Sequence, residues 1–398
     1  MELIVRAREG QAAGSQPVEV VERKGLGHPD TICDAVAERV SIELSRYYRT
    51  HFDAILHHNV DKVLLCGGSS RVTFGGGEIL EPIEIYLAGR ATSEYRAERI
   101  PVHDIAIAAC RAVLQRHVRE LDVDADVRIT SKLRPGSADL RRLYDKSGTV
   151  PHANDTSCGV GFFPLTDLER VVLAVERELT DSRHLAEHPE IGEDVKVMGV
   201  RRDHRIDITV GCAFIARHVR DIREYASKKD DACTRILAAA RRVTDTNINV
   251  VINAADDLSS GDVFITVTGT SAESGDDGEV GRGNRVSGLI TPYRISTMEA
   301  AAGKNPVSHV GKLYNIVARR VAESIVTGVP NVSDATCALV SQIGRSVTDP
   351  HIADIQLGIN GGRSFSDVWR EVADVVRTEL ERLPALRDAL LDGTVPVF

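Results

Sequence analysis

The sequence is poor in aromatic residues, since one Trp, eight Tyr and eight Phe make up only 4% of its 398 residues. The core must therefore consist mainly of aliphatic side chains, and surfaces for stacking nucleic-acid bases are not expected. Basic residues do not predominate either, because 49 Lys and Arg against 58 Asp and Glu give a formal charge of −9. This balance argues against a protein dedicated to nucleic-acid binding.

Long apolar segments are also absent. No segment reaches the roughly 18 apolar residues that a membrane-spanning helix requires, and residues 1–16 lack the apolar region of a signal peptide. The seven cysteines include no C-x-x-C pair, which argues against a zinc ribbon or a disulfide framework. We therefore expect a cytoplasmic enzyme of two or three domains that binds neither membrane nor nucleic acid.

The order of the predicted elements recurs along the chain. Amphipathic helices are predicted to begin at Pro29, Thr166 and His309, about 140 residues apart. Each is followed by strand-like segments and by a second helix. The second helices are predicted over residues 105–118, 221–243 and 368–383. This recurrence predicts three similar α+β units, each a sheet with helices on one face, although such an order can also arise by chance.

A glycine-rich segment, residues 269–285, reads GTSAESGDDGEVGRGNR. Backbone N–H groups in such a loop can form an anion-binding nest. Asp276 and Asp277 suit Mg²⁺, while Arg282 and Arg285 suit phosphate oxygens. The segment lacks the ending of a P-loop and could be a mobile surface loop. The mixture of acids and arginines favours a polyphosphate–metal site.

Residues 22–34 read ERKGLGHPDTICD. His28 directly precedes the predicted helix, and Asp30 lies in its first turn, where the helix dipole favours a carboxylate. Both can be simple capping residues. The alternative is a helix N-terminus that faces an anion, with His28 donating to the anion, Asp30 holding a cation, and Gly25 and Gly27 allowing close approach of the ligand.

Shorter segments add further candidates. Glu78 follows three glycines and either belongs to a turn or anchors a substrate amine. Asn154 and Asp155 are good turn formers, and Lys196 opens a strand where a lone lysine is most often exposed. Lys304 precedes a predicted helix N-terminus, which suits a phosphate. Together these residues have the composition of a Mg²⁺–triphosphate site.

These motifs resemble those of the S-adenosylmethionine synthetases, or methionine adenosyltransferases, of the divergent archaeal-type branch. The matching segments are residues 22–34, 75–79, 153–162, 194–196, 274–292 and 303–306. The first and fifth of these segments are long and specific. They make a chance similarity implausible.

The resemblance implies an enzyme that makes S-adenosylmethionine from ATP and L-methionine, with Mg²⁺ and usually K⁺, and then hydrolyses the released triphosphate. It implies three α/β-sandwich domains with pseudo-threefold symmetry and a homodimer whose active sites lie at the subunit interface. The domains would comprise residues 22–130 with about 285–307, residues 1–21 with about 157–284, and about 131–156 with 308–398.

The resemblance also implies roles for individual residues. His28, Arg282 and Lys304 would be catalytic, with His28 acting on the ATP oxygen that leaves C5′. The residues expected to bind ATP or triphosphate are Glu22, Gly136, Ser137, Asp139, Asn154, Asp155, Asp194, Lys196, Arg285 and Lys312. Glu78 and Asp276 would bind methionine. Asp30 and Asp277 would hold Mg²⁺.

The sequence departs from the commoner bacterial and eukaryotic branch, because charged residues of that branch are missing. The positions concerned hold Thr31, Gly283, Ser308 and Val310. We expect Arg285, Lys312 and His309 to compensate. The sequence identifies no K⁺ ligand and does not distinguish a dimer from a tetramer. Two alternatives are an ATP-dependent kinase or ligase that releases ADP or AMP, and a nucleotide-binding regulator without turnover.

Overall fold

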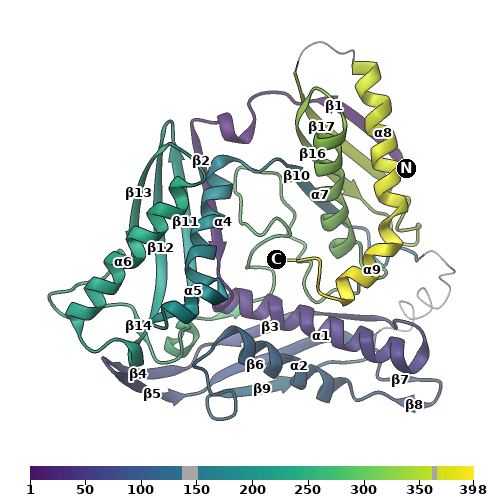
Figure 1. Cartoon of the computed structure of the whole chain (residues 1–398). Coiled ribbons are helices and arrows are strands. Elements are labelled where there is room, and N and C mark those ends of the chain that lie inside the picture. The colour runs from purple at the N-terminus through teal and green to yellow at the C-terminus, as the bar shows by residue number, and fades with distance from the viewer. Residues whose placement is uncertain (137–150, 361–364) are drawn as a thin grey trace.

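The structure is a computed structural model that describes residues 1–136, 151–360 and 365–398. Three sheets surround the middle of the molecule, where the C-terminus also lies, and helices α1, α4 and α7 lie close to that centre (Figure 1). The chain is α+β, as predicted. Within the described ranges, no helix is long and apolar enough to cross a membrane.

The first sheet has the order β15-β3-β6-β9. Its strands are β3 (His58–Cys66), β6 (Ile83–Ala91), β9 (Val127–Ser131) and β15 (Gly278–Glu279), with helices α1 (Pro29–Phe52) and α2 (Val102–His117). Two small hairpins accompany it. They are β4 (Ser69–Thr73) with β5 (Gly76–Glu81), and β7 (Glu94–Tyr95) with β8 (Glu98–Arg99).

The second sheet has the order β13-β12-β11-β2, and β14 pairs with the end of β12. Its strands are β2 (Val18–Lys24), β11 (Ile191–Arg202), β12 (Arg205–Ile215), β13 (Asn247–Ile252) and β14 (Ile265–Thr266). Its helices are α4 (Asp167–Thr180), α5 (Ser182–Glu187) and α6 (Ile222–Arg241). Three short 3₁₀ turns cover Ala13–Ser15, Ala216–His218 and Ser271–Ser274.

The third sheet has the order β1-β17-β16-β10. Its strands are β1 (Glu2–Ala7), β10 (Cys158–Phe163), β16 (Val332–Val340) and β17 (Ile352–Ile359). Its helices are α7 (Val310–Gly328), α8 (Phe365–Glu381) and α9 (Leu383–Leu391). The predicted division put residues 1–21 and 157–284 together, but β1 and β10 pair with β17 and β16 of this sheet. In addition, β15 pairs with β3 of the first sheet, so the division differs from the pairing at three strands.

The three sheets share one pairing pattern. In each, an edge strand runs parallel to its neighbour, and two antiparallel pairings follow: β13-β12-β11-β2, β9-β6-β3-β15 and β1-β17-β16-β10. This repetition confirms the prediction of three similar units. It was not detectable as residue similarity because backbone pairing does not require identical side chains.

The sequence signals for the three central helices have clear structural counterparts. His28 caps α1 and Pro29 occupies its first turn. Thr166 and Glu169 form the predicted capping box of α4, with bonds of 3.1 and 2.8 Å. His309 caps α7. All three helix starts therefore lie where the sequence predicted them.

Candidate active site

The segment before α1 packs tightly on strand β11. The N–H groups of Gly25 and Gly27 donate to the carbonyls of Val195 and Glu193, at 2.6 and 2.9 Å. A Cβ on Gly27 would lie 2.6 Å from the backbone nitrogen of Asp194. These glycines therefore allow close approach to β11, whereas we had expected them to approach a ligand.

His28 is held in one orientation at the N-terminus of α1. Its Nδ1 accepts a hydrogen bond from the N–H of Asp30 at 3.2 Å. Burial, and next the positive charge of Lys24, lower the pKa of His28 to about 4. The imidazole is therefore neutral near pH 7, and because Nδ1 is the acceptor, Nε2 carries the proton and can donate it.

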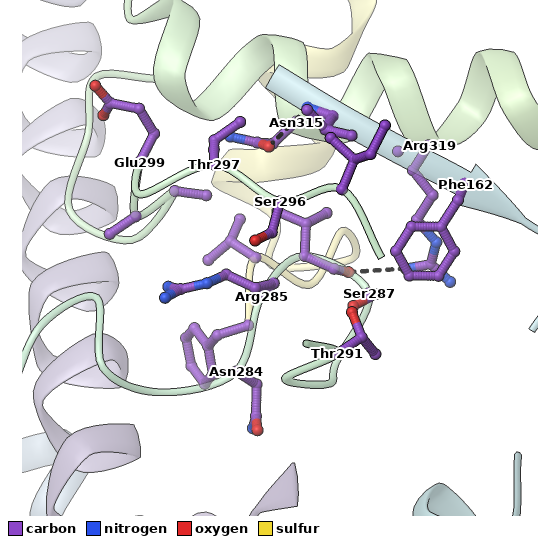
Figure 2. A pocket seen from close by; sticks show the side chains of 18 of the residues that line it. Phe162, Asn284, Arg285, Ser287, Thr291, Ser296, Thr297, Glu299, Asn315 and Arg319 are labelled. Atoms are coloured by element: carbon purple, nitrogen blue, oxygen red, sulfur yellow. Dashed lines mark hydrogen bonds between the residues drawn. The ribbon is translucent and has the colours of Figure 1, made fainter. Parts of the chain in front are cut away.

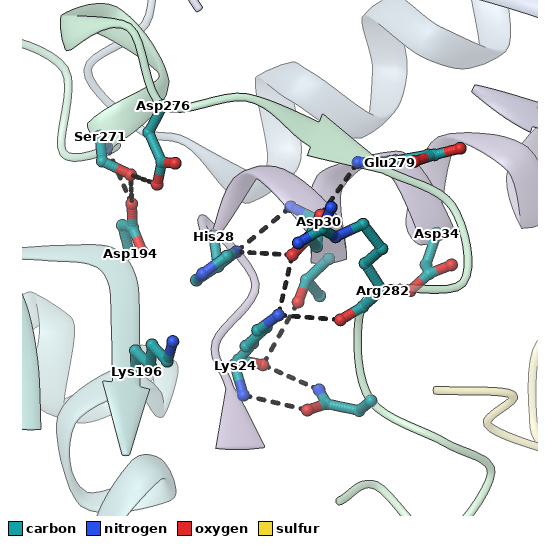
Figure 3. Close-up of polar contacts among 12 residues, drawn as sticks. Lys24, His28, Asp30, Asp34, Asp194, Lys196, Ser271, Asp276, Glu279 and Arg282 are labelled. Carbon is teal, nitrogen blue, oxygen red and sulfur yellow. Dashed lines mark hydrogen bonds and ion pairs between the residues drawn. The ribbon is translucent and has the colours of Figure 1, made fainter. Parts of the chain in front are cut away.

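Asp30 is paired with a lysine that sequence reasoning missed. Its Oδ2 lies 2.8 Å from Nζ of Lys24, and its Oδ1 accepts from the N–H of Glu279 at 2.9 Å. Nζ of Lys24 also donates to the carbonyl of Arg282 at 2.8 Å (Figure 3). Thr31 contacts the Lys24 carbonyl at 3.4 Å. The ammonium group of Lys24 thus lies between the Asp30 carboxylate and the backbone of Arg282.

Asp34, one turn further along α1, explains the glycine at position 283. Its Oδ1 accepts from the N–H of Gly281 at 2.9 Å, while its buried Oδ2 has no hydrogen-bond partner among the described residues. A Cβ on Gly283 would overlap this Oδ2. Burial raises the pKa of Asp34 to about 7. A lysine at position 283 therefore does not fit this backbone arrangement.

A second polar group lies on the other side of His28. Oδ2 of Asp194 accepts from the N–H of Ser271 at 2.8 Å, and the Ser271 hydroxyl lies 2.9 Å from Oδ2 of Asp276 (Figure 3). Burial raises the pKa of Asp194 to about 7. Glu22 lies 3.4 Å from Nζ of Lys196, whose side chain is half exposed. The glycine-rich loop and β11 thus meet at the N-terminus of α1.

A cavity of about 750 Å³ is lined by Glu279 and Arg282, whose backbone groups contact Asp30 and Lys24. It collects charged residues from segments that are distant in the sequence. The charged and histidine residues that line it are Asp61, Lys62, Asp155, Glu279, Arg282, Glu299, Lys304 and His309. The guanidinium of Arg282 is exposed and has no acidic partner among the described residues. It is therefore available to an anion.

Lys304 is held between two carboxylates that the sequence did not reveal. Its Nζ lies 2.7 Å from Oδ2 of Asp61 and 3.3 Å from Oε2 of Glu299. Burial opposes ionisation of Asp61, but the charge and hydrogen bonds of Lys304 and Lys62 outweigh it and lower the pKa of Asp61 to about 2. Asp61 is therefore ionised and fixes the lysine at the cavity wall.

Other predicted residues lie elsewhere. Lys312 is 1% exposed and donates to both oxygens of Glu38, at 2.7 and 2.8 Å, so its charge is neutralised inside the protein and does not replace a missing ligand-binding charge. Arg285 donates to the carbonyl of Gly281 and lines a smaller pocket, whose residues Figure 2 shows. Glu78 lies on the β4–β5 hairpin, largely exposed and 2.7 Å from Arg71.

The remaining predicted residues are placed as follows. Oδ1 of Asp277 accepts from the N–H of Gly67 at 2.9 Å, which ties the glycine-rich loop to the end of β3. Asn154 has a buried Oδ1 without a partner among the described residues. Gly136 is buried at the edge of a described range. Ser137 and Asp139 lie outside the described residues.

The described residues contain no cluster of three or more His, Cys, Asp or Glu that could hold a metal ion by itself. Mg²⁺ is usually bound by one or two carboxylates together with substrate phosphates, so such a cluster is not required. The Asp30 carboxylate uses two acceptor positions of about four, which leaves lone pairs for a cation. The oxygen donors around His28 therefore fit Mg²⁺ bound with a phosphate.

Three repeated α+β units, a neutral histidine at a helix N-terminus and a cavity lined by Lys62, Arg282 and Lys304 are the features expected of an enzyme that acts on an anionic substrate. The sequence matches the family model of S-adenosylmethionine synthetase (AdoMet synthetase) over residues 1–394. The chain belongs to this family. Its enzyme class is methionine adenosyltransferase.

Curated relatives are similar to this chain over nearly its whole length. The chain is 49% identical to the probable S-adenosylmethionine synthase of Aquifex aeolicus, with 93% of this chain and 92% of that protein covered. It is 47% identical to the S-adenosylmethionine synthase of Pyrobaculum neutrophilum, with complete coverage of both. The corresponding protein of Halobacterium salinarum is 43% identical, with 99% and 98% covered. The resemblance to the archaeal-type branch is thus confirmed.

A solved structure supports the fold. An unusual S-adenosylmethionine synthetase from Campylobacter jejuni superimposes with a TM-score of 0.60 over 92% of this chain and 88% of that chain. The two sequences are only 14% identical. The architecture is therefore shared although most side chains differ.

Proposed function

We propose that the protein joins ATP and L-methionine by in-line attack of the methionine sulfur on C5′ of ATP. Triphosphate leaves, and the same site hydrolyses it to phosphate and pyrophosphate. The observation that carries this proposal is His28 at a helix N-terminus, where the bond from Asp30 N–H to Nδ1 leaves the proton on Nε2, for which the described residues offer no acceptor. Such a group can donate to the oxygen that leaves C5′.

The methionine sulfur is a good neutral nucleophile, so the reaction needs no general base. The barrier lies in aligning the sulfur with C5′ and in stabilising the charge of the departing triphosphate. Arg282 and Lys304 line one cavity and would bind that triphosphate. Bound Mg²⁺ would neutralise part of this charge, and Asp30 with Asp277 would hold it. K⁺ is proposed from the family resemblance alone.

A homodimer with shared active sites is part of the proposal. Glu78, the residue expected to bind the methionine amine, does not line the cavity of its own chain but lies on the exposed β4–β5 hairpin. A second copy could bring this hairpin to the cavity. Mixing His28→Asn and Lys304→Ala subunits tests whether the sites are shared. A mixed dimer retains one intact site only if the His28 and the Lys304 of a site come from different chains.

The first experiment incubates the purified protein with ATP, L-methionine, Mg²⁺ and K⁺. We expect S-adenosylmethionine by mass detection, together with equal amounts of phosphate and pyrophosphate that appear only with methionine. Release of ADP or AMP would instead indicate a kinase or ligase. Binding of ATP without any product would indicate a regulator.

A further inference from the structure

A second cavity, apart from the candidate active site, is lined by arginines. Its volume is about 520 Å³, and it lies between α4, α7, residues 286–288 and the C-terminal residues. Its lining contains no acidic side chain. The four arginines are Arg23, Arg170, Arg177 and Arg319. This local excess of positive charge contrasts with the formal charge of −9 for the chain.

Within the described ranges, two of these arginines are paired with acidic side chains. Arg23 pairs with Glu176 at 2.7 Å, and Arg170 pairs with an exposed aspartate of the same helix. Among the residues that the structure describes, neither Arg177 nor Arg319 has an acidic partner within 4.0 Å. Arg319 donates to the Val286 carbonyl at 2.9 Å, which orients its guanidinium. Unbalanced positive charges repel each other, and a bound anion would relieve that repulsion.

The rest of the lining limits the kind of anion. Leucine, valine, proline and phenylalanine side chains line the cavity together with the arginines, and such a combination of apolar and charged groups is typical of small-molecule sites. A planar guanidinium matches phosphate oxygens in a bidentate way. We propose that this cavity binds a di- or triphosphate group, carried either by a nucleotide or by free pyrophosphate.

The pocket of Figure 2 lies between this cavity and the candidate active site, because it has lining residues in common with both. That pocket shares Glu299 and Ala300 with the active-site cavity and shares Leu165, Val286, Ser287, Arg319 and Phe398 with the arginine-lined cavity. The proposal concerns binding and does not depend on the catalysed reaction.

The test is calorimetric titration of inorganic pyrophosphate into the Lys304→Ala protein, in which binding at the active site is weakened. Adding Arg177→Ala and Arg319→Ala should raise the Kd at least about tenfold, because charge-assisted hydrogen bonds are lost. The matched control is Arg223→Ala with Arg241→Ala, which removes the same charge from exposed positions of α6. The control should leave the Kd within about twofold, since solvent screens distant charges.

Thermal unfolding shows whether each variant is folded, and Arg177→Gln alone is a milder second variant at an exposed position. A repeat with ADP distinguishes the two sources of the ligand. Tighter binding of ADP supports a nucleotide, while equal or weaker binding supports free pyrophosphate. Absence of binding, or equal Kd values for the cavity and control variants, would overturn the proposal.

Discussion

Helices α1 and α7 both begin with a capping histidine, but different side chains surround the two histidines. His28 and His309 are both N-caps, and in both the ring Nδ1 accepts from the backbone N–H two residues further on, at 3.2 Å. Burial lowers the pKa of His28 to about 4 and that of His309 to about 3. Two of the three units thus carry a neutral, oriented imidazole at this position, whereas α4 is capped by Thr166. The side chains around each histidine must decide which one takes part in the reaction.

The ion pairs beside the two histidines come from different parts of the chain. Beside His28, the Lys24–Asp30 pair comes from one short segment of the chain. Beside His309, Lys304 pairs with Asp61 of β3, so two distant segments must meet. The comparison teaches that a symmetric scaffold can support asymmetric chemistry, because only the backbone pattern is repeated.

The largest expected effect is on stability, from breaking either ion pair. Lys24→Met removes the cation beside the buried Asp30, and Lys304→Met leaves the buried Asp61 with only the exposed Lys62 as a partner. Each change should lower the free energy of unfolding by about 3 kcal/mol. Urea unfolding followed by circular dichroism measures this. Lys196→Met, at a half-exposed lysine, is the control and should cost less than about 1 kcal/mol. A loss of stability in only one of the two variants would show that the two ion pairs do not contribute equally.

The next effect separates the histidines by catalysis. His28→Asn should lower kcat at least about 100-fold, the scale of one lost transition-state donor, because Asn cannot place a donor at the Nε2 position in the same way. His309→Asn, which retains a good N-cap residue, should lower kcat less than about tenfold. Steady-state kinetics measures kcat of both variants, and circular dichroism spectra show whether each variant is folded. Equal losses would mean that the two sites share the donor role.

A smaller effect concerns the glycines that face carboxylates at the two helix ends. Gly283→Ala would force a methyl group against the buried Asp34 and should cost about 2 kcal/mol of stability. Gly311→Ala would place its Cβ 2.8 Å from Oε2 of Glu299, a partly exposed side chain that can move, and should cost less than about 1 kcal/mol. Denaturant midpoints measure both changes, and the reverse order would contradict the proposed packing.

The last comparison concerns pH dependence. The pKa of Asp34 is raised to about 7, so above the unfolded value near 4 the folded state holds a proton that the unfolded state has lost. This contribution falls as pH rises from about 4 to 7, by at most about 1.4 kcal/mol per pH unit. Asp34→Asn should therefore gain stability relative to wild type between pH 5 and 7.

Asp61 provides the opposite case. Its pKa is lowered to about 2, so both folded and unfolded states are ionised between pH 5 and 7. The stability difference between Asp61→Asn and wild type should thus be constant over this range. Unfolding free energies of each variant and of the wild type at pH 5, 6 and 7 measure both effects. A difference between Asp34→Asn and wild type that does not change with pH would show that the carboxyl group of Asp34 titrates normally.

The sequence by itself determined the local features. Periodicity and capping residues placed the starts of α1, α4 and α7, and the motifs around His28 and Arg282 identified the family. These features could be predicted because a cap, a helix face or a loop motif depends on residues a few positions apart. The membership of β1 and β10 could not be predicted, since pairing joins strands separated by hundreds of residues.

Only the tertiary structure decided which charges are available. Lys312 and Lys304 look alike in the sequence, but Lys312 is enclosed with Glu38, whereas Lys304 lies at the cavity wall with Asp61 and Glu299. Lys24, too, became significant only through its contact with Asp30. A side chain's chemistry in the folded protein depends on its burial and on the charges within a few ångströms, and packing between distant segments sets both.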